Sequence, residues 1–268
     1  MSEAVLEIEK LSKSYTMGRK EVQALSDVDL KVNKGEFIAI MGPSGSGKTT
    51  LLNMLGCLDK PSGGKVVLDR VDVAELPEKE LYKIRRNKIG FIFQTFNLLP
   101  YLSAAENVEL PMEGTKKSKS ERRKRARELL ELVGLSGREE HRPHRLSAGE
   151  QQRVAIARAL ANDPAIILAD EPTGNLDTQN KYEIVRLLAS LNIKRGTTIV
   201  MVTHDSQVAS HTERLLLLKD GKIAKEKQGL HLARKKLMCP YCGSKTQPSD
   251  ERCLNCGRRL LSTKEEHL

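Results

Sequence analysis

The sequence is organised around an apolar run, Phe37-Ile38-Ala39-Ile40-Met41, that leads directly into Gly42-Pro43-Ser44-Gly45-Ser46-Gly47-Lys48-Thr49-Thr50. The run predicts a buried strand, and the residues after it have the spacing of a phosphate-binding loop that opens a helix. Its glycines let backbone N–H groups point at phosphate oxygens, while Lys48 is placed for the β- and γ-phosphates and the Thr49 hydroxyl for Mg²⁺. We therefore predict that residues 42–50 bind a nucleotide.

Composition and charge narrow the class of protein. The chain has 268 residues, enough for one well-filled domain and a small appendage, and a net charge of +10. Much of the excess falls in residues 116–127, which open a predicted helix. A solvated helix face explains this charge better than nucleic-acid binding does, because no aromatic residues interleave with it. No apolar run approaches the ~18–20 residues of a membrane span, so we expect a cytoplasmic protein.

Three further apolar runs alternate with helical patterns, which predicts an α/β fold with a buried parallel sheet. They are residues 89–93, 165–169 and 198–202. Residues 5–8 and 28–32 alternate apolar and polar side chains, as half-exposed antiparallel strands do, so the fold is expected to be mixed. The parallel runs end in the phosphate loop, Gln94, Asp170-Glu171 and His204-Asp205. Ligands bind at the carboxyl ends of such strands, so these groups are expected to meet.

The pattern also suggests domain boundaries. Residues 1–228 are expected to form the main domain, with a helical subdomain inserted at about residues 96–164. The Asp220-Gly221 pair predicts the turn of a hairpin near the end of this domain. Residues 229–238 are polar and basic and are interpreted as a linker to a small module at residues 239–259.

Two segments carry candidate chemistry beyond the phosphate loop. Asp170 is placed to hold Mg²⁺ through its hydration shell, and Glu171 to polarise a water for attack on the γ-phosphate. Leu146-Ser147-Ala148-Gly149-Glu150 precedes a helical apolar pattern. Ser147 is a natural N-cap and Glu150 completes a capping box, so on its residues alone this segment is a well-capped helix start.

Together the motifs resemble those of the ABC (ATP-binding cassette) ATPases. In the family's order they are the phosphate loop, Gln94, the Leu-Ser-x-Gly signature at residues 146–149, Asp170-Glu171, Asn175-Leu176-Asp177 and His204. The resemblance implies a P-loop NTPase fold with a mixed sheet, an antiparallel β subdomain and an inserted helical subdomain. It also implies ATP and Mg²⁺ as cofactors, hydrolysis of ATP to ADP and phosphate, and a homodimer that sandwiches two ATP molecules head to tail.

The resemblance further implies a role for each motif. Tyr15 would stack on adenine, Gln94 would sense a transporter partner, and His204 would hold Glu171 and water in line. The implied catalytic residues are Lys48, Gln94, Glu171 and His204, and the implied Mg²⁺ ligands are Thr49, Gln94 and Asp170. The implied nucleotide-binding set is Tyr15, residues 42–50, Gln94, Asp170, Asp177 and, acting on the ATP of the opposite protomer, Ser147, Ala148, Gly149 and Glu150.

The signature departs from the family's usual pattern, because Ala148-Gly149-Glu150 stands where Gly-Gly-Gln is common. A carboxylate near a polyphosphate is repulsive unless it turns back to cap its own helix, as the capping box allows. The departure bears on how tightly the ATP sandwich closes, and not on the fold.

Four segments resemble the lipoprotein-release and macrolide-export branch of the family: residues 41–48, 51–61, 93–100 and 106–111. This resemblance implies a separately encoded membrane permease, docked near residues 94–100, and a peripheral location on the inner face of the cell membrane. Two alternatives share the ATPase. One is a soluble ATPase acting on nucleic acid or ribosomes, which the lack of a second cassette or long coiled coil disfavours. The other regulates an extracellular enzyme through a permease-like partner.

Two Cys-x-x-Cys-Gly knuckles follow the linker, at Cys239-Pro240-Tyr241-Cys242-Gly243 and Cys253-Leu254-Asn255-Cys256-Gly257. Four thiolates in paired knuckles suit tetrahedral Zn²⁺, and the segment resembles a short zinc ribbon. Iron in a rubredoxin-like site and a redox dithiol are the alternatives. So short a segment cannot bury a core, so the metal is expected to fold it. The fifth cysteine, Cys57, is expected to be a buried thiol.

Overall fold

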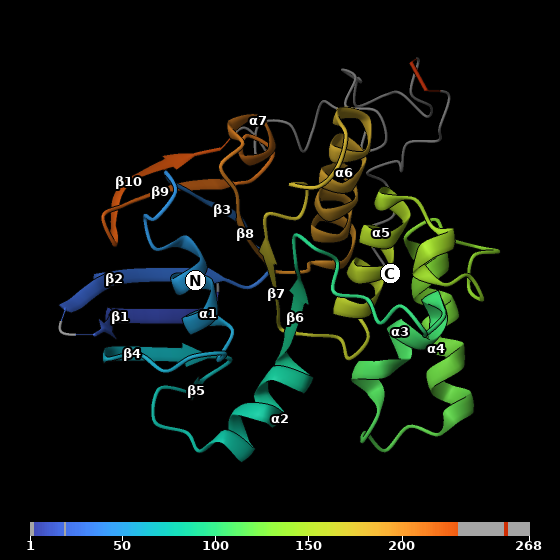
Figure 1. Ribbon diagram of the computed structural model, residues 1–268, viewed down its shortest axis with the longest axis horizontal. Helices are drawn as coiled ribbons and strands as arrows, with labels where there is room; N and C mark the ends of the chain where they lie inside the picture. The colour runs from blue at the N-terminus through green and yellow to red at the C-terminus, as the bar shows by residue number, and fades with distance from the viewer. Residues whose placement is uncertain (1–2, 19, 230–254, 257–268) are drawn as a thin grey trace.

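The computed structural model describes residues 3–18, 20–229 and 255–256 (Figure 1). The linker predicted at residues 229–238 lies outside this range except for Gly229. Cys239, Cys242 and Cys253 of the predicted metal module also lie outside it, whereas Cys256 is described and exposed.

The described residues form two sheets, of which the first has four antiparallel strands in the order β2-β1-β4-β5. Its strands are β1 (Ala4–Met17), β2 (Lys20–Asn33), β4 (Gly63–Leu68) and β5 (Val71–Asp72). The predicted antiparallel strands at residues 5–8 and 28–32 are confirmed, and both extend much further towards the turn of the β1–β2 hairpin. Bulges on either side of Leu11 interrupt the alternation, which is why the sequence pattern stopped short.

The second sheet of the described residues has six strands in the order β10-β9-β3-β8-β7-β6. They are β3 (Phe37–Met41), β6 (Ile89–Ile92), β7 (Ile166–Asp170), β8 (Ile199–Val202), β9 (Arg214–Lys219) and β10 (Lys222–Gln228). All neighbours are parallel except β9 and β10, which form the predicted hairpin at Asp220-Gly221. The mixed sheet is thus confirmed, and the carboxyl ends of β3, β8 and β7 lie next to one another.

The helices of the described chain are α1 (Lys48–Leu55), α2 (Glu78–Lys88), α3 (Ala104–Glu109), α4 (Lys119–Leu132), α5 (Ala148–Ala159), α6 (Thr178–Arg195) and α7 (Ser206–Ala209). Short 3-10 turns occupy Leu110–Met112 and Pro143–Arg145. In this part of the chain three helices, α3, α4 and α5, begin with a complete capping box. The basic helix therefore begins after Ser118, and it ends before Gly134, which has a φ of 77°.

Buried side chains of the described residues form two clusters, one on each face of the six-stranded sheet. Successive residues of a strand point to opposite faces. Phe37 and Ala39 therefore join the cluster of α3, α4, α5 and α6, whereas Ile38 and Ile40 join that of α1 and the antiparallel sheet. Figure 1 shows this separation, with α1 beside β1 and β2 and with α5 beyond β6 and β7. The helix that follows the phosphate loop, α1, and the signature helix, α5, thus lie on opposite faces of the sheet.

Candidate functional site

The phosphate loop joins β3 to α1 and has room for glycine alone at two positions. A Cβ at Gly42 would lie 2.2 Å from the Leu218 carbonyl oxygen, and one at Gly47, where φ is 99°, would lie 2.5 Å from the Ala24 carbonyl oxygen. The Lys48 ammonium donates to the carbonyl oxygens of Gly42 (2.9 Å) and Pro43 (2.8 Å). The buried hydroxyl of Ser46 has no hydrogen-bond partner among the described residues. The loop therefore offers an ammonium, an unused hydroxyl and a helix N-terminus to an anion.

The acidic pair stands at the end of β7, across from this loop. Asp170 is the last residue of the strand and is half-buried. Burial raises the pKa of Asp170, the neighbouring Glu171 carboxylate raises it further, and the Lys48 ammonium lowers it. Helix α1, which begins at Lys48, packs against β7, which ends at Asp170. The structure thus brings the loop and the acidic pair to one place, as the strand ends predicted, and this arrangement fits a bound Mg²⁺–phosphate group.

Glu171 turns back from β7 towards the residues that follow β8. Its φ is 43°, and its N–H donates to the Val202 carbonyl oxygen at 3.0 Å. The Thr203 hydroxyl donates to Glu171 Oε2 at 3.1 Å, and the His204 N–H donates to Oε1 at 3.0 Å. His204 Nδ1 lies 2.8 Å from the same Oε1. Both carboxylate oxygens are held, and the Glu171 side chain is only 15% exposed, whereas that of His204 is 72% exposed.

Thr203 was not among the predicted site residues. It is fully buried and its N–H donates to the Ile40 carbonyl oxygen of β3 at 3.1 Å, which fixes its position. Its place between a buried strand and His204 was the only sequence signal that could have identified it.

Gln94 follows β6 and is exposed. Its Nε2 donates weakly to Asn175 Oδ1 at 3.4 Å, and Asn175 Nδ2 donates to the Gln94 carbonyl oxygen at 3.0 Å. A Cβ at Gly174 would lie 2.7 Å from Gln94 Nε2. The Gln94 loop and the segment after the acidic pair are therefore in direct contact.

Two residues that the sequence did not mark hold the loop after Gln94. Arg158 of α5 donates to the carbonyl oxygens of Phe96 (2.8 Å) and Asn97, whose φ values of 60° and 48° are left-handed. Asn107 of α3 is fully buried, and its Nδ2 donates to the carbonyl oxygens of Leu99, Leu102 and Ser103. The bonded residues are separated by between four and 62 positions in the sequence. No local pattern signals them.

The signature segment begins α5 as the capping box predicted. Glu150 Oε2 accepts from the Ser147 N–H at 2.8 Å, and the Glu150 N–H donates to Ser147 Oγ at 3.2 Å. Its Oε1 lies 3.3 Å from Arg138 Nε. The hydrogen bond from the Ser147 N–H holds the pKa of Glu150 below its usual value, against an opposing effect of burial, and Arg138 lowers it further. The Glu150 carboxylate is thus turned back onto its own helix.

The signature also touches the start of α6. A Cβ at Gly149 would lie 2.3 Å from Asn180 Oδ1. Asp177 caps α6 by accepting from the Asn180 N–H at 2.9 Å and from its Nδ2 at 2.6 Å. The structure therefore groups Gly149 with Asp177 through Asn180. It does not bring the signature residues of the same chain to the phosphate loop.

Tyr15 lies on β1 and is 36% exposed. Its hydroxyl donates to Asp59 Oδ2 at 2.9 Å, and the Lys13 ammonium lies 4.8 Å from the ring centroid. Asp59 belongs to the turn after α1, so Tyr15 is linked to the helix that begins at the phosphate loop.

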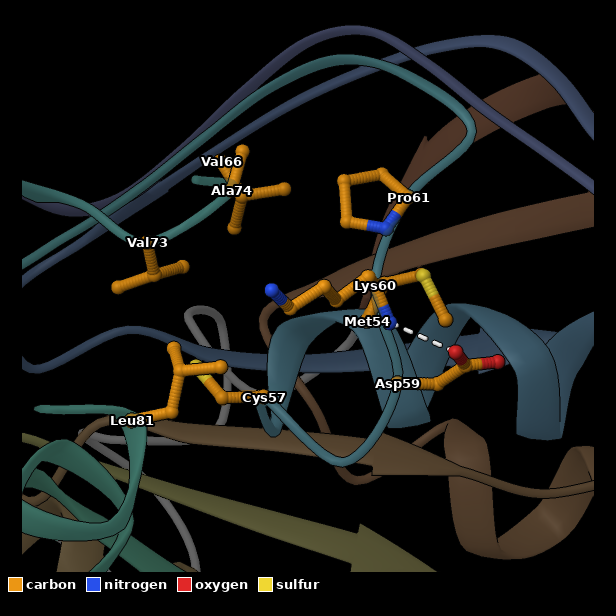
Figure 2. A pocket seen from close by; sticks show the side chains of 9 residues that line it. All are labelled: Met54, Cys57, Asp59, Lys60, Pro61, Val66, Val73, Ala74 and Leu81. Atoms are coloured by element: carbon orange, nitrogen blue, oxygen red, sulfur yellow. Dashed lines mark hydrogen bonds between the residues drawn. The ribbon is translucent and has the colours of Figure 1, made fainter. Parts of the chain in front are cut away.

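A small cavity of about 10 Å³ lies behind α1 and away from the phosphate loop (Figure 2). Cys57, Asp59 and Leu81 are among its lining residues. Cys57 is buried as predicted, and burial raises the pKa of its thiol to about 11. Among the described residues no group of three or more His, Cys, Asp or Glu side chains could hold a metal ion. None of the helices in that part of the chain is long and apolar enough to cross a membrane.

The family model for ABC transporters matches residues 25–174. The chain belongs to the ABC transporter family. It is 52% identical over 229 residues to the uncharacterized ABC transporter ATP-binding protein MJ0796 of Methanocaldococcus jannaschii, which covers 84% of this chain and 97% of that relative. It is 47% identical over 231 residues to the macrolide export ATP-binding/permease protein MacB of Burkholderia thailandensis, a match of 86% of this chain but only 35% of MacB.

A solved structure of MJ0796, described as a dimeric post-hydrolysis state of the ATP-binding cassette bound to ADP and Pi, superposes with a TM-score of 0.77 at 51% identity. The match covers 83% of this chain and 98% of that structure. The family and the fold predicted from the sequence motifs are therefore confirmed. The chain is an ATP-binding subunit of an ABC transporter with ATPase activity.

Proposed function

We propose that two copies of this chain close head to tail around two ATP molecules and so drive a separate membrane permease. The observation that carries the proposal is the placement of α1 and α5 on opposite faces of the central sheet, which sets the phosphate loop apart from the signature. One chain then lacks a second group of donors for the γ-phosphate. A second copy would supply the N-terminus of its α5, where free backbone N–H groups and the helix dipole favour a phosphate. The dimeric MJ0796 structure supports this arrangement.

In the proposed site each chain contributes two sets of residues. Tyr15, residues 42–50, Gln94 and Asp170 bind the chain's own nucleotide, and Ser147, Ala148 and Gly149 bind that of the partner. Glu150 closes the helix cap behind them, and Asp177 positions the start of α6. Thr49, Gln94 and Asp170 are the proposed Mg²⁺ ligands, and the ion supplies charge neutralisation at the phosphates.

Glu171 is the proposed general base. Thr203 and His204 hold its two oxygens, so the carboxylate has little freedom to rotate and can accept a proton from a water aligned with the γ-phosphate. Lys48 neutralises charge on the β- and γ-phosphates. His204 is exposed enough to reach a phosphate oxygen while still contacting Glu171.

The Glu171→Gln variant tests this mechanism, because the amide keeps the size of the side chain and cannot take the proton. We expect ATP binding to persist, hydrolysis to fall by about 10²–10⁴-fold, and the dimer to accumulate with ATP. Phosphate release and light scattering measure these outcomes. Glu183→Gln is the matched control, because it removes a carboxylate that pairs with Arg153 outside the proposed site. A Glu171→Gln protein that stays monomeric and hydrolyses ATP at the wild-type rate would refute the proposal.

The proposed permease resembles the membrane part of the macrolide-export and lipoprotein-release systems. MacB carries ATP-binding and permease functions in one protein, and this chain matches only about a third of it. The loop at residues 94–100 is the proposed docking place, and the nearby Tyr101 is 64% exposed. Such docking puts the protein on the inner face of the membrane. Purification of the chain from its native membrane should recover an integral membrane protein, and its recovery should fall when Tyr101 is replaced by Glu.

We further propose that Cys239, Cys242, Cys253 and Cys256 hold one Zn²⁺ ion, with the spacing of the two knuckles as the support. A chain ending at Gly229 is the control. Elemental analysis should find one zinc per full-length chain and none in the shortened chain. Iron in its place, or no metal, would overturn the assignment.

A further inference from the structure

The turn between α1 and β4 is fastened to β1 at several points. The Ser62 N–H donates to the Ser12 carbonyl oxygen at 2.9 Å, and the Ser14 N–H donates to Ser62 Oγ at 3.1 Å. The Lys13 ammonium donates to the Lys60 carbonyl oxygen at 2.7 Å. The turn therefore holds a fixed position beside the strand that carries Tyr15.

Asp59 uses this position to hold Tyr15. Its Oδ2 accepts from the Tyr15 hydroxyl at 2.9 Å, and its Oδ1 pairs with the Lys13 ammonium at 2.9 Å. The Lys60 N–H also donates to Oδ1 at 2.7 Å, the bond drawn in Figure 2. In the same view the Asp59 carboxylate points away from Leu81 and Val73. We call Lys13, Tyr15 and Asp59 the tyrosine clamp.

The electrostatics make the clamp a strong one. Burial would raise the pKa of Asp59, but the hydrogen bonds from Lys13 and Tyr15 outweigh it and the pKa falls below its usual value. Burial and the Asp59 carboxylate raise the pKa of Tyr15, against an opposing hydrogen bond of Thr50. At neutral pH the phenol is therefore a donor to an ionised carboxylate, which is the stronger class of hydrogen bond.

Tyr15 combines a cation contact with partial exposure to solvent. The Lys13 ammonium lies over one face, at a distance typical of a cation–π contact. The residue is nevertheless 36% exposed, so part of its surface remains available for contact with a flat base. A ring already held by its hydroxyl and by a cation loses little freedom when a base stacks on it.

We propose that Asp59 and Lys13 are positioning residues that hold the Tyr15 ring ready to stack on the adenine of ATP. The proposal rests on the role of Tyr15 proposed above and adds to it. Asp59 and Lys13 act on the base alone, so their loss should weaken the binding of ATP without weakening that of the phosphate chain.

Two probes separate the base from the phosphates: ATP and inorganic tripolyphosphate, each titrated calorimetrically into the full chain with Mg²⁺. Tyr15→Ala should weaken ATP binding about tenfold, since stacking on an aromatic ring carries most of the base affinity. Asp59→Ala should weaken it about fivefold. Tripolyphosphate binding should stay within twofold of wild type in both.

Tyr15→Phe keeps the ring and removes only the hydroxyl, so it tests the clamp even where Asp59→Ala does not fold. It should reproduce the loss seen with Asp59→Ala, and the two changes combined should add nothing further, because they break the same bond. Asp69→Ala is the matched control, because it removes a carboxylate paired with Lys88 outside the clamp and should leave both affinities unchanged.

The outcomes distinguish the clamp from the role of Tyr15. An equal loss of ATP and tripolyphosphate in Asp59→Ala or Tyr15→Phe would overturn the clamp, because the contact would then support the phosphate loop. Loss of ATP affinity in Tyr15→Ala with none in Tyr15→Phe would also overturn it, and would leave adenine stacking intact. No effect in Tyr15→Ala would overturn stacking itself, and the clamp with it.

Discussion

Replacing Glu150 by glutamine tests whether the unusual carboxylate of the signature is a helix cap or a charge that opposes ATP. The amide keeps an oxygen to accept from the Ser147 N–H and leaves the bond to Ser147 Oγ unchanged. It removes the ion pair with Arg138, whose side chain is 48% exposed, and this pair stabilises by about 0.3 kcal/mol. It also removes a negative charge from a helix N-terminus, which stabilises by about 0.5 kcal/mol.

The variant should therefore lose about 0.8 kcal/mol of unfolding free energy at pH 7, or about 2–3 °C in Tm for a domain of this size. Because the folded state lowers the pKa of Glu150, its ionised form stabilises the protein fully above the unfolded pKa of about 4.5. That stabilisation is lost as the pH falls through the lower folded pKa. Thermal unfolding curves of wild type and variant should therefore converge in acid.

The ATPase rate should change by less than about threefold, because the carboxylate is turned onto its own helix. Glu106→Gln, in the equivalent capping box of α3, is the matched control and should show a similar loss of stability. A tenfold or larger gain in ATPase rate for Glu150→Gln alone would refute the reasoning, because the charge would then reach the nucleotide across the dimer.

Three other changes have expected outcomes. Gly149→Ala must displace the Asn180 amide, so it should lower the free energy of unfolding in urea by about 1–3 kcal/mol. Gly63→Ala is the control and should be neutral, because a Cβ there meets nothing within 4 Å. Equal free energies of unfolding for the two variants would show that the Asn180 side chain moves aside at no cost. Arg158→Met leaves two carbonyl oxygens without their donor, so it should lower the free energy of unfolding by about 2 kcal/mol. Arg153→Met breaks a more exposed ion pair and should lower it by less than about 1 kcal/mol. Reversal of that order would contradict the anchoring of the loop. Cys57 is buried and its thiol has a pKa of about 11, so it should resist alkylation at pH 8 in the folded protein and react in urea. Peptide mass spectrometry measures the labelling. Rapid labelling of Cys57 in the folded protein would show that the turn after α1 opens.

The parts of the candidate site that could be predicted are those formed by residues adjacent in the sequence. The phosphate loop, the acidic pair and the capping box each combine a short spacing with a strand or helix boundary, and the sheet then brings strand ends together. Thr203 and Asp59 could not be predicted in the same way, because each acts through one hydrogen bond to a residue 32 or 44 positions away. Such bonds depend on the register of the strands and on the conformation of turns, and neither produces a periodic pattern in the sequence.

The fold shows the same division between local and long-range information. Apolar runs predicted the central strands to within one or two residues. The β1–β2 hairpin was underestimated because its bulges break the alternation, with Lys10 and Asp27 at φ values of 48° and 47°. The four contacts that bury Asn107 span only four to eight positions, but they follow an irregular turn that has no periodic pattern in the sequence.

The two hydrogen bonds from Arg158 have a mechanical meaning. Arg158 and Ser147 lie at opposite ends of α5, so a rod of about 16 Å joins the loop at Phe96 and Asn97 to the signature. A helix of this length is stiff along its axis, and the hydrogen bonds of Arg158 attach its C-terminal end to the loop. We therefore expect a displacement of the loop to move α5 as a unit and so to shift Ser147, because the helix is continuous between the two.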